Sequence, residues 1–259
     1  MSKQTFTIIG MGFVGGAVYN AMKDAYYLNV IDPHKGDEDI PSKYDNVDGF
    51  IICVPTPEGK DGRCDDHLVT DYIERIRLQS DKPILIKSTT DIDTLRDIRD
   101  ENVTFSPEFL VAANANEDFA NQDFAIFGGD NGRFWYNVLN SVCNIKQVRF
   151  TDIVTAGFAK YTINSFLATK VVFFNELHSL FETYSDRSFH KLTFDELTEL
   201  VSLDKRIGNS HMQVPGPDSE FGFGGACFPK DTKAFTKFAK GLSELDLLQT
   251  AIEINKTLR

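Results

Sequence analysis

The sequence predicts an α/β protein in which a doubly wound parallel sheet comes first and a long central helix and a small helical domain follow. Three observations support this. Strand-like runs alternate with helical patterns over about the first 150 residues, as is typical of parallel sheets. A glycine-rich turn joins the first strand to the first helix. Residues 152–184 contain no proline and one glycine, which favours a single long helix. We therefore expect a first domain over residues 1–150 and a second over residues 151–259.

The glycine turn has the spacing of a dinucleotide-binding motif. The β-forming run "TFTII" leads into Gly10, Gly12 and Gly15, which form G-x-G-x-x-G, and a helical pattern follows. A second predicted strand ends at Asp32, 22 residues after Gly10, where a carboxylate accepts hydrogen bonds from an adenosine ribose. The context favours a Rossmann-like domain that binds NAD rather than NADP. Lys35 nearby slightly weakens that preference.

Further strands and helices alternate along the first domain. The expected strands are 49–55, 83–89, 102–107 and 124–129, and the expected helices are about 66–79, 91–100 and 131–140. Ligands of such sheets bind beyond the carboxyl ends of the strands. The candidate site segments are therefore "VPTP" (54–57), "KSTT" (87–90) and "SPEF" (106–109). Turn chemistry explains their Pro, Ser and Thr residues but not Glu108 at a strand end.

The long helix carries a polar pair within an apolar pattern. Lys160 and Asn164 are four residues apart and share a helix face, with Asn175 three turns beyond. Spacing alone favours a functional pair and solvated side chains equally. Helical patterns follow at Phe194–Leu203 and from Thr232 onward.

The stretch "FGFGGACFPKD" raises a chemical hypothesis. Cys227 precedes Pro229, which suits a first helical turn, so its thiol would lie at the positive end of a helix dipole and favour the nucleophilic thiolate. Lys230 would act in the same direction, and Asp231 could handle a proton. An isolated cysteine is more often a small buried residue, the interpretation that suits Cys53 and Cys143.

Composition excludes several classes of function. A net charge of −11 disfavours nucleic acid and anionic membranes as partners, although an anionic small ligand remains compatible with it. The sequence contains no window of about 18 apolar residues, so no membrane span is predicted. The start of the chain shows no signal-peptide pattern, and its cysteines form no CxxC pair, which predicts reduced thiols in a cytoplasmic protein without a metal site.

Seven segments together resemble the UDP-glucose dehydrogenases, within the wider nucleotide-sugar 6-dehydrogenases. In family order they are "GMGFVG" (10–15), "VPTP" (54–57), "KSTT" (87–90), "SPEFL" (106–110), "AKYTINSFLATKVVFFNE" (159–176), "DKRIGNSHMQVPGPD" (204–218) and "GFGGACFPKD" (222–231). They span nearly the whole chain, and the last is highly specific. The resemblance implies two successive NAD-dependent oxidations at C6 of a nucleotide sugar, from alcohol to aldehyde to acid.

The resemblance also implies roles for individual residues. Cys227 would form a thiohemiacetal and then a thioester, Lys160 and Asn164 would stabilise oxyanions, Asp231 and Thr89 would manage protons through a shared water, and Glu108 would assist thioester hydrolysis. The expected NAD contacts are Gly10, Gly12, Phe13, Val14, Gly15, Asp32, Lys35, Val54, Thr56, Ser88 and Lys230. The expected substrate contacts are Phe109, Leu110, Arg206, Phe223, Gly224 and Gly225, with Arg206 reaching the substrate of a neighbouring subunit in a homodimer built around the long helix.

The chain departs from the family pattern in four places. The family normally continues into a third, nucleotide-holding domain beyond the point where this sequence ends at "EINKTLR"; Ala112, "NQDF" (121–124) and Phe221 replace residues common in the family. Three functions stay open. In the first, the chain is an active minimal dehydrogenase whose substrate contacts come from its two domains, from a partner subunit or from a separate chain. Alternatively, it is a non-catalytic NAD-binding remnant, or a β-hydroxyacid-type dehydrogenase that performs one oxidation without a cysteine. The choice among UDP-glucose, N-acetylated UDP sugars and GDP-mannose also stays open.

Overall fold

The computed structural model describes residues 3–98, 100–111, 114–185 and 193–259. The chain divides into two compact units, Met1–Lys160 and Tyr161–Arg259. The division falls inside the long helix, later than the start of the second domain expected from the sequence, and the domain assignment itself stays a prediction.

The first unit is built around a seven-stranded sheet in the part of the chain that the structure describes. Its strands are β1 (Thr5–Ile9), β2 (Tyr27–Ile31), β3 (Gly49–Ile52), β4 (Ile84–Ile86), β5 (Val103–Phe105), β6 (Ala125–Gly128) and β7 (Val148–Thr151), in the spatial order β2-β1-β3-β4-β5-β6-β7. The helices of this unit are α1 (Phe13–Met22), α2 (His67–Arg77), α3 (Ile92–Asp97), α4 (Ala115–Ala120) and α5 (Gly132–Asn140), with short 3₁₀ turns at Pro33–Lys35 and Pro41–Lys43. The α/β class expected from the sequence is confirmed.

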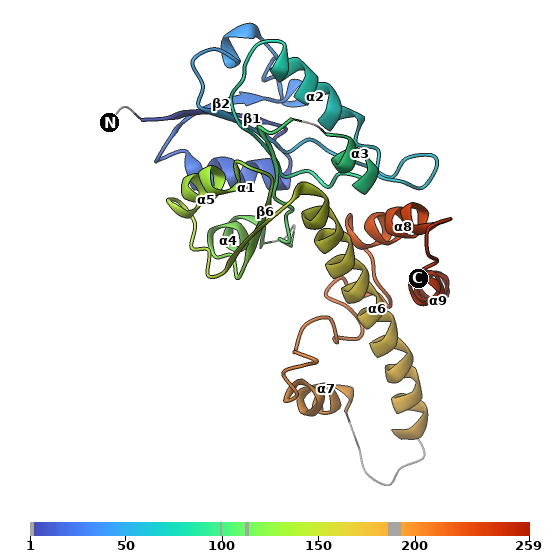
Figure 1. Cartoon of the computed structure of the whole chain (residues 1–259). Helices are drawn as coiled ribbons and strands as arrows, with labels where there is room; N and C mark the ends of the chain where they lie inside the picture. Colours follow the sequence, from blue (N-terminus) through green and yellow to red (C-terminus); the bar gives the residue numbers. More distant parts are fainter. Residues whose placement is uncertain (1–2, 99, 112–113, 186–192) are drawn as a thin grey trace. The chain divides into compact units, whose positions relative to one another are not determined.

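The side chains of alternate strand residues pack into two hydrophobic cores, one on each face of the sheet. Phe6, Ile8 and Leu85 pack with α1, α4 and α5, whereas Phe50 and Ile84 pack with α2 and α3 on the other face (Figure 1). Because both faces are buried, β3 and β4 read as continuous apolar runs. The predicted double winding follows from this pattern.

The first unit differs from the expected one in three respects, two in the sheet and one in its helices. β5 and β6 pair antiparallel, through Phe105 and Gly128, while the other pairs are parallel. β7 was not predicted, because this edge strand is short and half-exposed and so forms no apolar run. α4, a helix of six residues, was also missed. Hydrophobic periodicity indicates which residues face a core, not the direction of the strand that carries them.

The long helix is confirmed as α6 (Ile153–Ser185). The second unit contains most of it, together with α7 (Phe194–Ser202), α8 (Phe228–Ala239) and α9 (Asp246–Leu258). The helical pattern from Thr232 onward is therefore interrupted, at Gly241 with its φ of +84°, and its first helix begins before Thr232. α6 and α9 share one apolar cluster around Val172, and α6 and α7 share another around Phe174.

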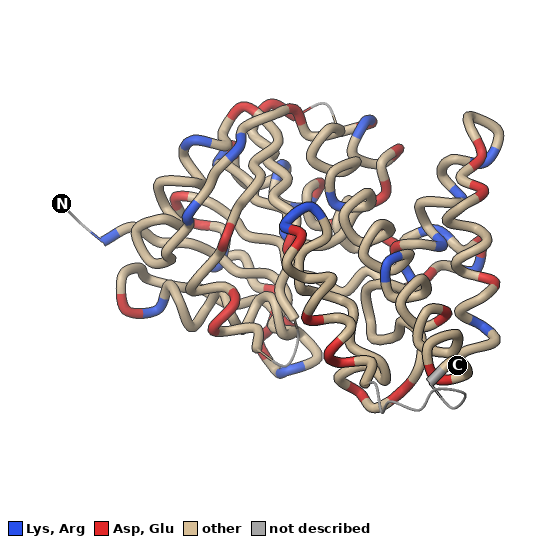
Figure 2. Tube along the Cα trace, turned by 90° about the horizontal axis from the view of Figure 1, so that it is seen from below, with Lys and Arg blue, Asp and Glu red and all other residues tan. Residues whose placement is uncertain are grey.

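The surface charge follows the composition. Acidic residues are spread over elements of both units and do not gather on one of them (Figure 2). Among the described helices, none is long and apolar enough to cross a membrane. The described residues also contain no group of three or more His, Cys, Asp or Glu side chains that could hold a metal ion.

Candidate active site

The predicted site segments of the first unit lie at one edge of the sheet. β1, β3, β4 and β5 are mutually parallel, so the loops that follow them leave the same edge. The ladder continues into these loops: the amide of Lys87 donates to the Ile52 carbonyl at 2.9 Å, and that of Ser106 donates to the Ile86 carbonyl at 2.9 Å. "VPTP", "KSTT" and "SPEF" are thus held side by side by strand geometry.

The glycine turn has the packing that a dinucleotide site requires. Gly10 has φ of +89°, and a Cβ there would overlap the carbonyl of Cys53; a Cβ on Gly15 would overlap the carbonyl oxygen of Gly10. Gly12, the N-cap of α1, has nothing within 4 Å of the position of a Cβ, and no side chain caps this helix. The turn therefore leaves open space beside uncapped backbone N–H groups, which suits a pyrophosphate. The residues present fit NAD.

Asp32 and Lys35 fasten the same turn. Asp32 Oδ2 accepts from the Met11 amide at 2.7 Å, and the Lys35 ammonium donates to the Met11 carbonyl. Asp32 lies directly after β2, as expected. Its contact with a ribose stays a prediction, as do the contacts of exposed Phe13 and partly buried Val14 with NAD.

Gly15→Ala is expected to lower the free energy of unfolding of the first unit by about 1–3 kcal/mol and to weaken NAD binding, because the added methyl group must displace Gly10. The single tryptophan, Trp135, is fully buried in this unit and reports its unfolding by fluorescence in urea. Gly16→Ala is the matched control, since it lies on α1 with nothing within 4 Å and should change stability by no more than about 1 kcal/mol. Equal stabilities of the two variants would contradict this account.

The loops after β3 and β4 are tied to each other. Ser88 Oγ donates to the Val54 carbonyl at 2.7 Å, and the Cys64 thiol contacts the carbonyls of Thr89, at 3.3 Å, and Thr56, at 3.8 Å. The hydroxyl of Ser88 is thereby used inside the protein. The expected NAD contacts of these residues and the proton role of Thr89 stay predictions.

Glu108 lies between two lysines. Its carboxylate Oε2 is 3.0 Å from Lys87 Nζ, its Oε1 accepts from the Phe109 amide at 3.0 Å, and its main-chain carbonyl accepts from the Lys160 ammonium. Lys160 is buried and lies over the Phe109 ring, 4.9 Å from its centroid. Leu110 packs against the core shared with α1. The structure thus brings Glu108, Lys160 and Phe109 together, and it adds Lys87, which opens the candidate segment "KSTT" but was not among the expected site residues.

The second unit joins Asn164, Asp231 and Lys230 in one buried network. Asn164 Nδ2 donates to Asp231 Oδ2 at 2.6 Å, and Lys230 Nζ lies 2.7 Å from Asp231 Oδ1. Asp231 is fully buried and belongs to the first turn of α8. Both carboxylate oxygens are therefore engaged, and Asn164 is buried rather than solvated, while its role in a site stays a prediction.

Cys227 is the N-cap of α8, as predicted, and Pro229 lies in the first turn. Its side chain makes no capping hydrogen bond. All four cysteines lie in the described part of the chain; three are buried and Cys227 is half-buried. Burial raises the pKa of the Cys53 thiol to about 12 and that of the Cys143 thiol to about 11, so these two stay protonated at neutral pH.

Two buried asparagines hold the glycine loop that leads to Cys227. Asn175 Oδ1 accepts from the Gly222 amide at 2.9 Å. Asn255 accepts from the Phe223 amide at 2.7 Å and donates to the Phe223 carbonyl at 3.0 Å. Since the Phe223 side chain is also buried, both its ring and its backbone are engaged inside the protein. No motif or spacing in the sequence pointed to Asn255, which lies in an ordinary helical pattern.

The remaining expected substrate residues differ in exposure. A Cβ on Gly224 would overlap the Arg259 guanidinium, which forms an ion pair with Asp218, whereas Gly225 has open space around it. The Arg206 side chain is almost fully exposed and pairs with Asp204 at 2.6 Å. Ala112 lies outside the described residues. The assignment of these residues to a substrate site stays a prediction.

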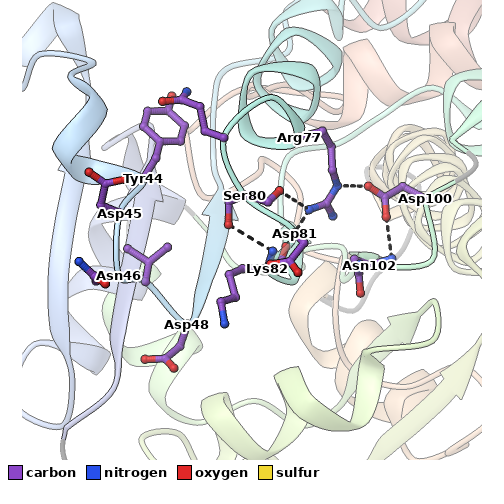
Figure 3. Close-up of a pocket in the computed structure, with 12 residues that line it drawn as sticks. Tyr44, Asp45, Asn46, Asp48, Arg77, Ser80, Asp81, Lys82, Asp100 and Asn102 are labelled. Atoms are coloured by element: carbon purple, nitrogen blue, oxygen red, sulfur yellow. Dashed lines mark hydrogen bonds and ion pairs between the residues drawn. The ribbon is translucent and has the colours of Figure 1, made fainter.

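A hollow of about 810 Å³ lies in the first unit at the opposite edge of the sheet. Asp48, Lys82 and Asn102 line it, directly before β3, β4 and β5. Figure 3 shows Arg77 between the main chain of Ser80 and the carboxylate of Asp100, so this arginine fastens the turn after α2. The hollow lies at the other end of these strands from the motifs of the first unit that follow them.

Two family models match this chain. The central domain of the UDP-glucose/GDP-mannose dehydrogenase family matches residues 154–257, and the NAD binding domain of the same family matches residues 32–142. The chain belongs to the UDP-glucose/GDP-mannose dehydrogenase family. Its cofactor is accordingly NAD, as predicted. A UDP-glucose 6-dehydrogenase from Rickettsia bellii is 32% identical over 257 residues, covering 92% of this chain and 56% of the relative. The chain thus spans about half the length of the relatives it matches.

Solved structures show the same fold. A UDP-glucose dehydrogenase from Pyrobaculum islandicum has a TM-score of 0.78 at 24% identity, covering 99% of this chain and 68% of that one. A 3-hydroxyisobutyrate dehydrogenase from Mycobacterium tuberculosis has a TM-score of 0.72 at 16% identity, covering 99% of this chain and 94% of that one. At these identities the likeness shows the fold alone.

Proposed function

We propose that this chain oxidises the C6 hydroxyl of a nucleotide sugar twice, converting UDP-glucose to UDP-glucuronate through a thiohemiacetal and a thioester on Cys227. The observation that carries the proposal is the half-buried thiol at the start of α8, one helical turn before a buried Asn164–Asp231–Lys230 network. A single-step oxidation has no use for such a thiol. Two NAD molecules, bound one after the other, would each accept one hydride.

Each residue then has a chemical task. Asp231, held by Asn164 and Lys230, manages the proton of the alcohol. Cys227 sulfur adds to the aldehyde carbon, and donors from Lys160 and Asn164 stabilise the oxygen that gains charge. After the second oxidation, water cleaves the thioester, and Glu108 takes a proton from that water. The chemistry requires a reduced Cys227, in keeping with a cytoplasmic location.

We also propose a homodimer formed through α6. Phe166, Phe173 and Leu180 are spaced seven residues apart and are exposed, as is Tyr184 one turn later. Such a stripe would be buried by a second copy of the helix. The exposed Arg206 side chain agrees with the expectation that it reaches the substrate of the neighbouring subunit.

A single-step β-hydroxyacid oxidation is the second candidate. It is favoured by the fold of the 3-hydroxyisobutyrate dehydrogenase, of which this chain covers 94%. That enzyme class needs a Lys-x-x-x-Asn helix, which Lys160 and Asn164 provide, but no cysteine.

The purified chain is expected to release two NADH for each UDP-glucuronate formed from UDP-glucose and NAD. The reason is that one carboxylate requires two hydride transfers from one C6 carbon. NADH is measured by absorbance and the acid by chromatography, and a panel of N-acetylated UDP sugars and GDP-mannose tests the choice of sugar. One NADH for each oxidised 3-hydroxy acid would support the second candidate. NAD binding by calorimetry without oxidation of any of these compounds would identify a binding module.

A further inference from the structure

Lys87 forms a buried ion pair with Glu108. The two side chains are 2% and 11% exposed, and Lys87 Nζ lies 3.0 Å from Glu108 Oε2. Lys87 follows β4 directly, and Glu108 is the third residue after the adjacent strand β5, so the pairing of these strands brings the two segments together. Removing a lysine from water is unfavourable by several kcal/mol unless a counter-charge compensates it. The pair therefore marks a place where the fold maintains a charge.

Among the described residues of the first unit, three further ionisable groups near Glu108 make contacts that differ from that of Lys87. The Lys160 ammonium contacts the main-chain carbonyl of Glu108. Cys53 and Cys143 both interact electrostatically with Lys87 and Glu108, but their raised pKa values keep them as neutral thiols. Lys87 is thus the ammonium in ion-pair contact with the Glu108 carboxylate.

The two oxygens of the Glu108 carboxylate differ. Oε1 accepts from the Phe109 amide, which fixes the orientation of the side chain. Oε2 is buried and, within the part of the chain that the structure describes, accepts no aligned hydrogen bond, although Lys87 lies beside it. Such an oxygen keeps a lone pair available while its charge is compensated. That is what a general base needs.

We propose that Lys87 is a positioning residue that holds Glu108 ionised, with Oε2 ready to take a proton from the water that cleaves the Cys227 thioester. This inference rests on the proposed function. In the step, the water oxygen bonds to the acyl carbon and the carbon–sulfur bond breaks with its electron pair on sulfur. The proton lost by water goes to Oε2 and from there to solvent. Without the ammonium, burial favours the protonated carboxyl group, which cannot act as a base.

Lys87→Met is expected to slow thioester hydrolysis at least about tenfold at neutral pH while leaving both oxidations in place. Rapid mixing with NAD and nucleotide sugar should then give a burst of two NADH for each Cys227, followed by slow turnover. Raising the pH should restore turnover, because hydroxide removes the proton that the neutral side chain lets Glu108 keep. Glu108→Gln should show the same burst with no recovery at high pH, and the exposed-lysine variant Lys82→Met should behave as the wild type.

The outcomes separate the two proposals. Normal hydrolysis in Glu108→Gln would remove Glu108 from the mechanism and with it part of the proposed function. Slow hydrolysis in Glu108→Gln but normal hydrolysis in Lys87→Met would overturn the role of Lys87 alone. A pH-independent loss of both oxidations and hydrolysis in Lys87→Met would indicate a purely structural ion pair. If that variant does not fold, Lys87→Gln offers a neutral side chain that still donates to Glu108.

A second measurement needs no turnover. Infrared difference spectra at neutral pH should show one additional protonated carboxyl band in Lys87→Met, absent from the wild type and from the Lys87→Met, Glu108→Gln double variant. Absence of this band would overturn the proposal even if the chain forms no acid with any sugar tested. A band that persists in the double variant would do the same, since it would belong to another carboxyl group.

Discussion

Replacing Cys227 by serine is expected to lower the rate of acid formation by a factor on the order of 10³ or more, while NAD binding stays nearly unchanged. A serine hydroxyl is not ionised at neutral pH and adds poorly to the aldehyde, so no thioester forms. The first oxidation needs no thiol, and the variant should release at most one NADH for each sugar. NADH and acid are measured together, and the mass of the quenched protein shows whether an acyl adduct is present.

The position of Cys227 makes this substitution informative. The thiol is the N-cap of α8 and makes no capping hydrogen bond, and serine is a favourable N-cap residue. Cys227→Ser should therefore leave the helix intact or stabilise it, so a loss of activity reflects chemistry. Cys143→Ser serves as the control, because this buried cysteine has no task in the mechanism. Wild-type acid formation by Cys227→Ser would exclude the covalent mechanism.

Most elements of the first unit, apart from β7 and α4, could be predicted because local chemistry determines them. The run Thr5–Ile9 and the glycines after it can form little other than a strand and a tight turn, and the proline-free segment after Asp152 indicated α6. The direction of β6 could not be predicted. It depends on how the chain crosses the sheet after β5, and a single pair, Phe105 and Gly128, joins these strands.

The site was predictable only where a motif carries it. Cys227 and Asp231 stand out in "FGFGGACFPKD", and the structure confirms their place at the start of α8. Lys87, although it opens the candidate segment "KSTT", was not among the expected site residues, and neither was Asn255, because the importance of both lies in long-range partners. Lys87 meets Glu108 through pairing of β4 with β5, and Asn255 meets Phe223 across 32 residues of chain. The spacing of residues along the sequence does not reveal that either pair is in contact.

Asp231→Asn is expected to destabilise the second unit by about 3 kcal/mol and to abolish acid formation. An asparagine at this position offers one acceptor oxygen to two donors, Asn164 Nδ2 and Lys230 Nζ, in a place that is fully buried. Hydrogen exchange of the α8 amides measures the local free energy of opening without assuming that both units unfold together. Asp246 is an exposed acid in the first turn of α9, and Asp246→Asn should change the local free energy of opening of that helix by less than about 1 kcal/mol.

A double-mutant cycle shows whether the charge pair or the asparagine contact dominates. If Lys230 is the main partner of Asp231, adding Lys230→Met to Asp231→Asn removes the ammonium that has lost its contact with this carboxylate and restores about 1 kcal/mol or more of the lost stability. If the two changes are additive, Asn164 is the main partner, and Asn164→Leu should then couple to Asp231→Asn instead. Measuring acid formation as well as stability in the double variant distinguishes a structural role of Asp231 from a chemical one. A double variant that regains stability and still binds NAD by calorimetry, but forms no acid, assigns the carboxylate of Asp231 to the reaction, whereas one that regains both stability and acid formation would leave this carboxylate a structural part of the α8 helix start.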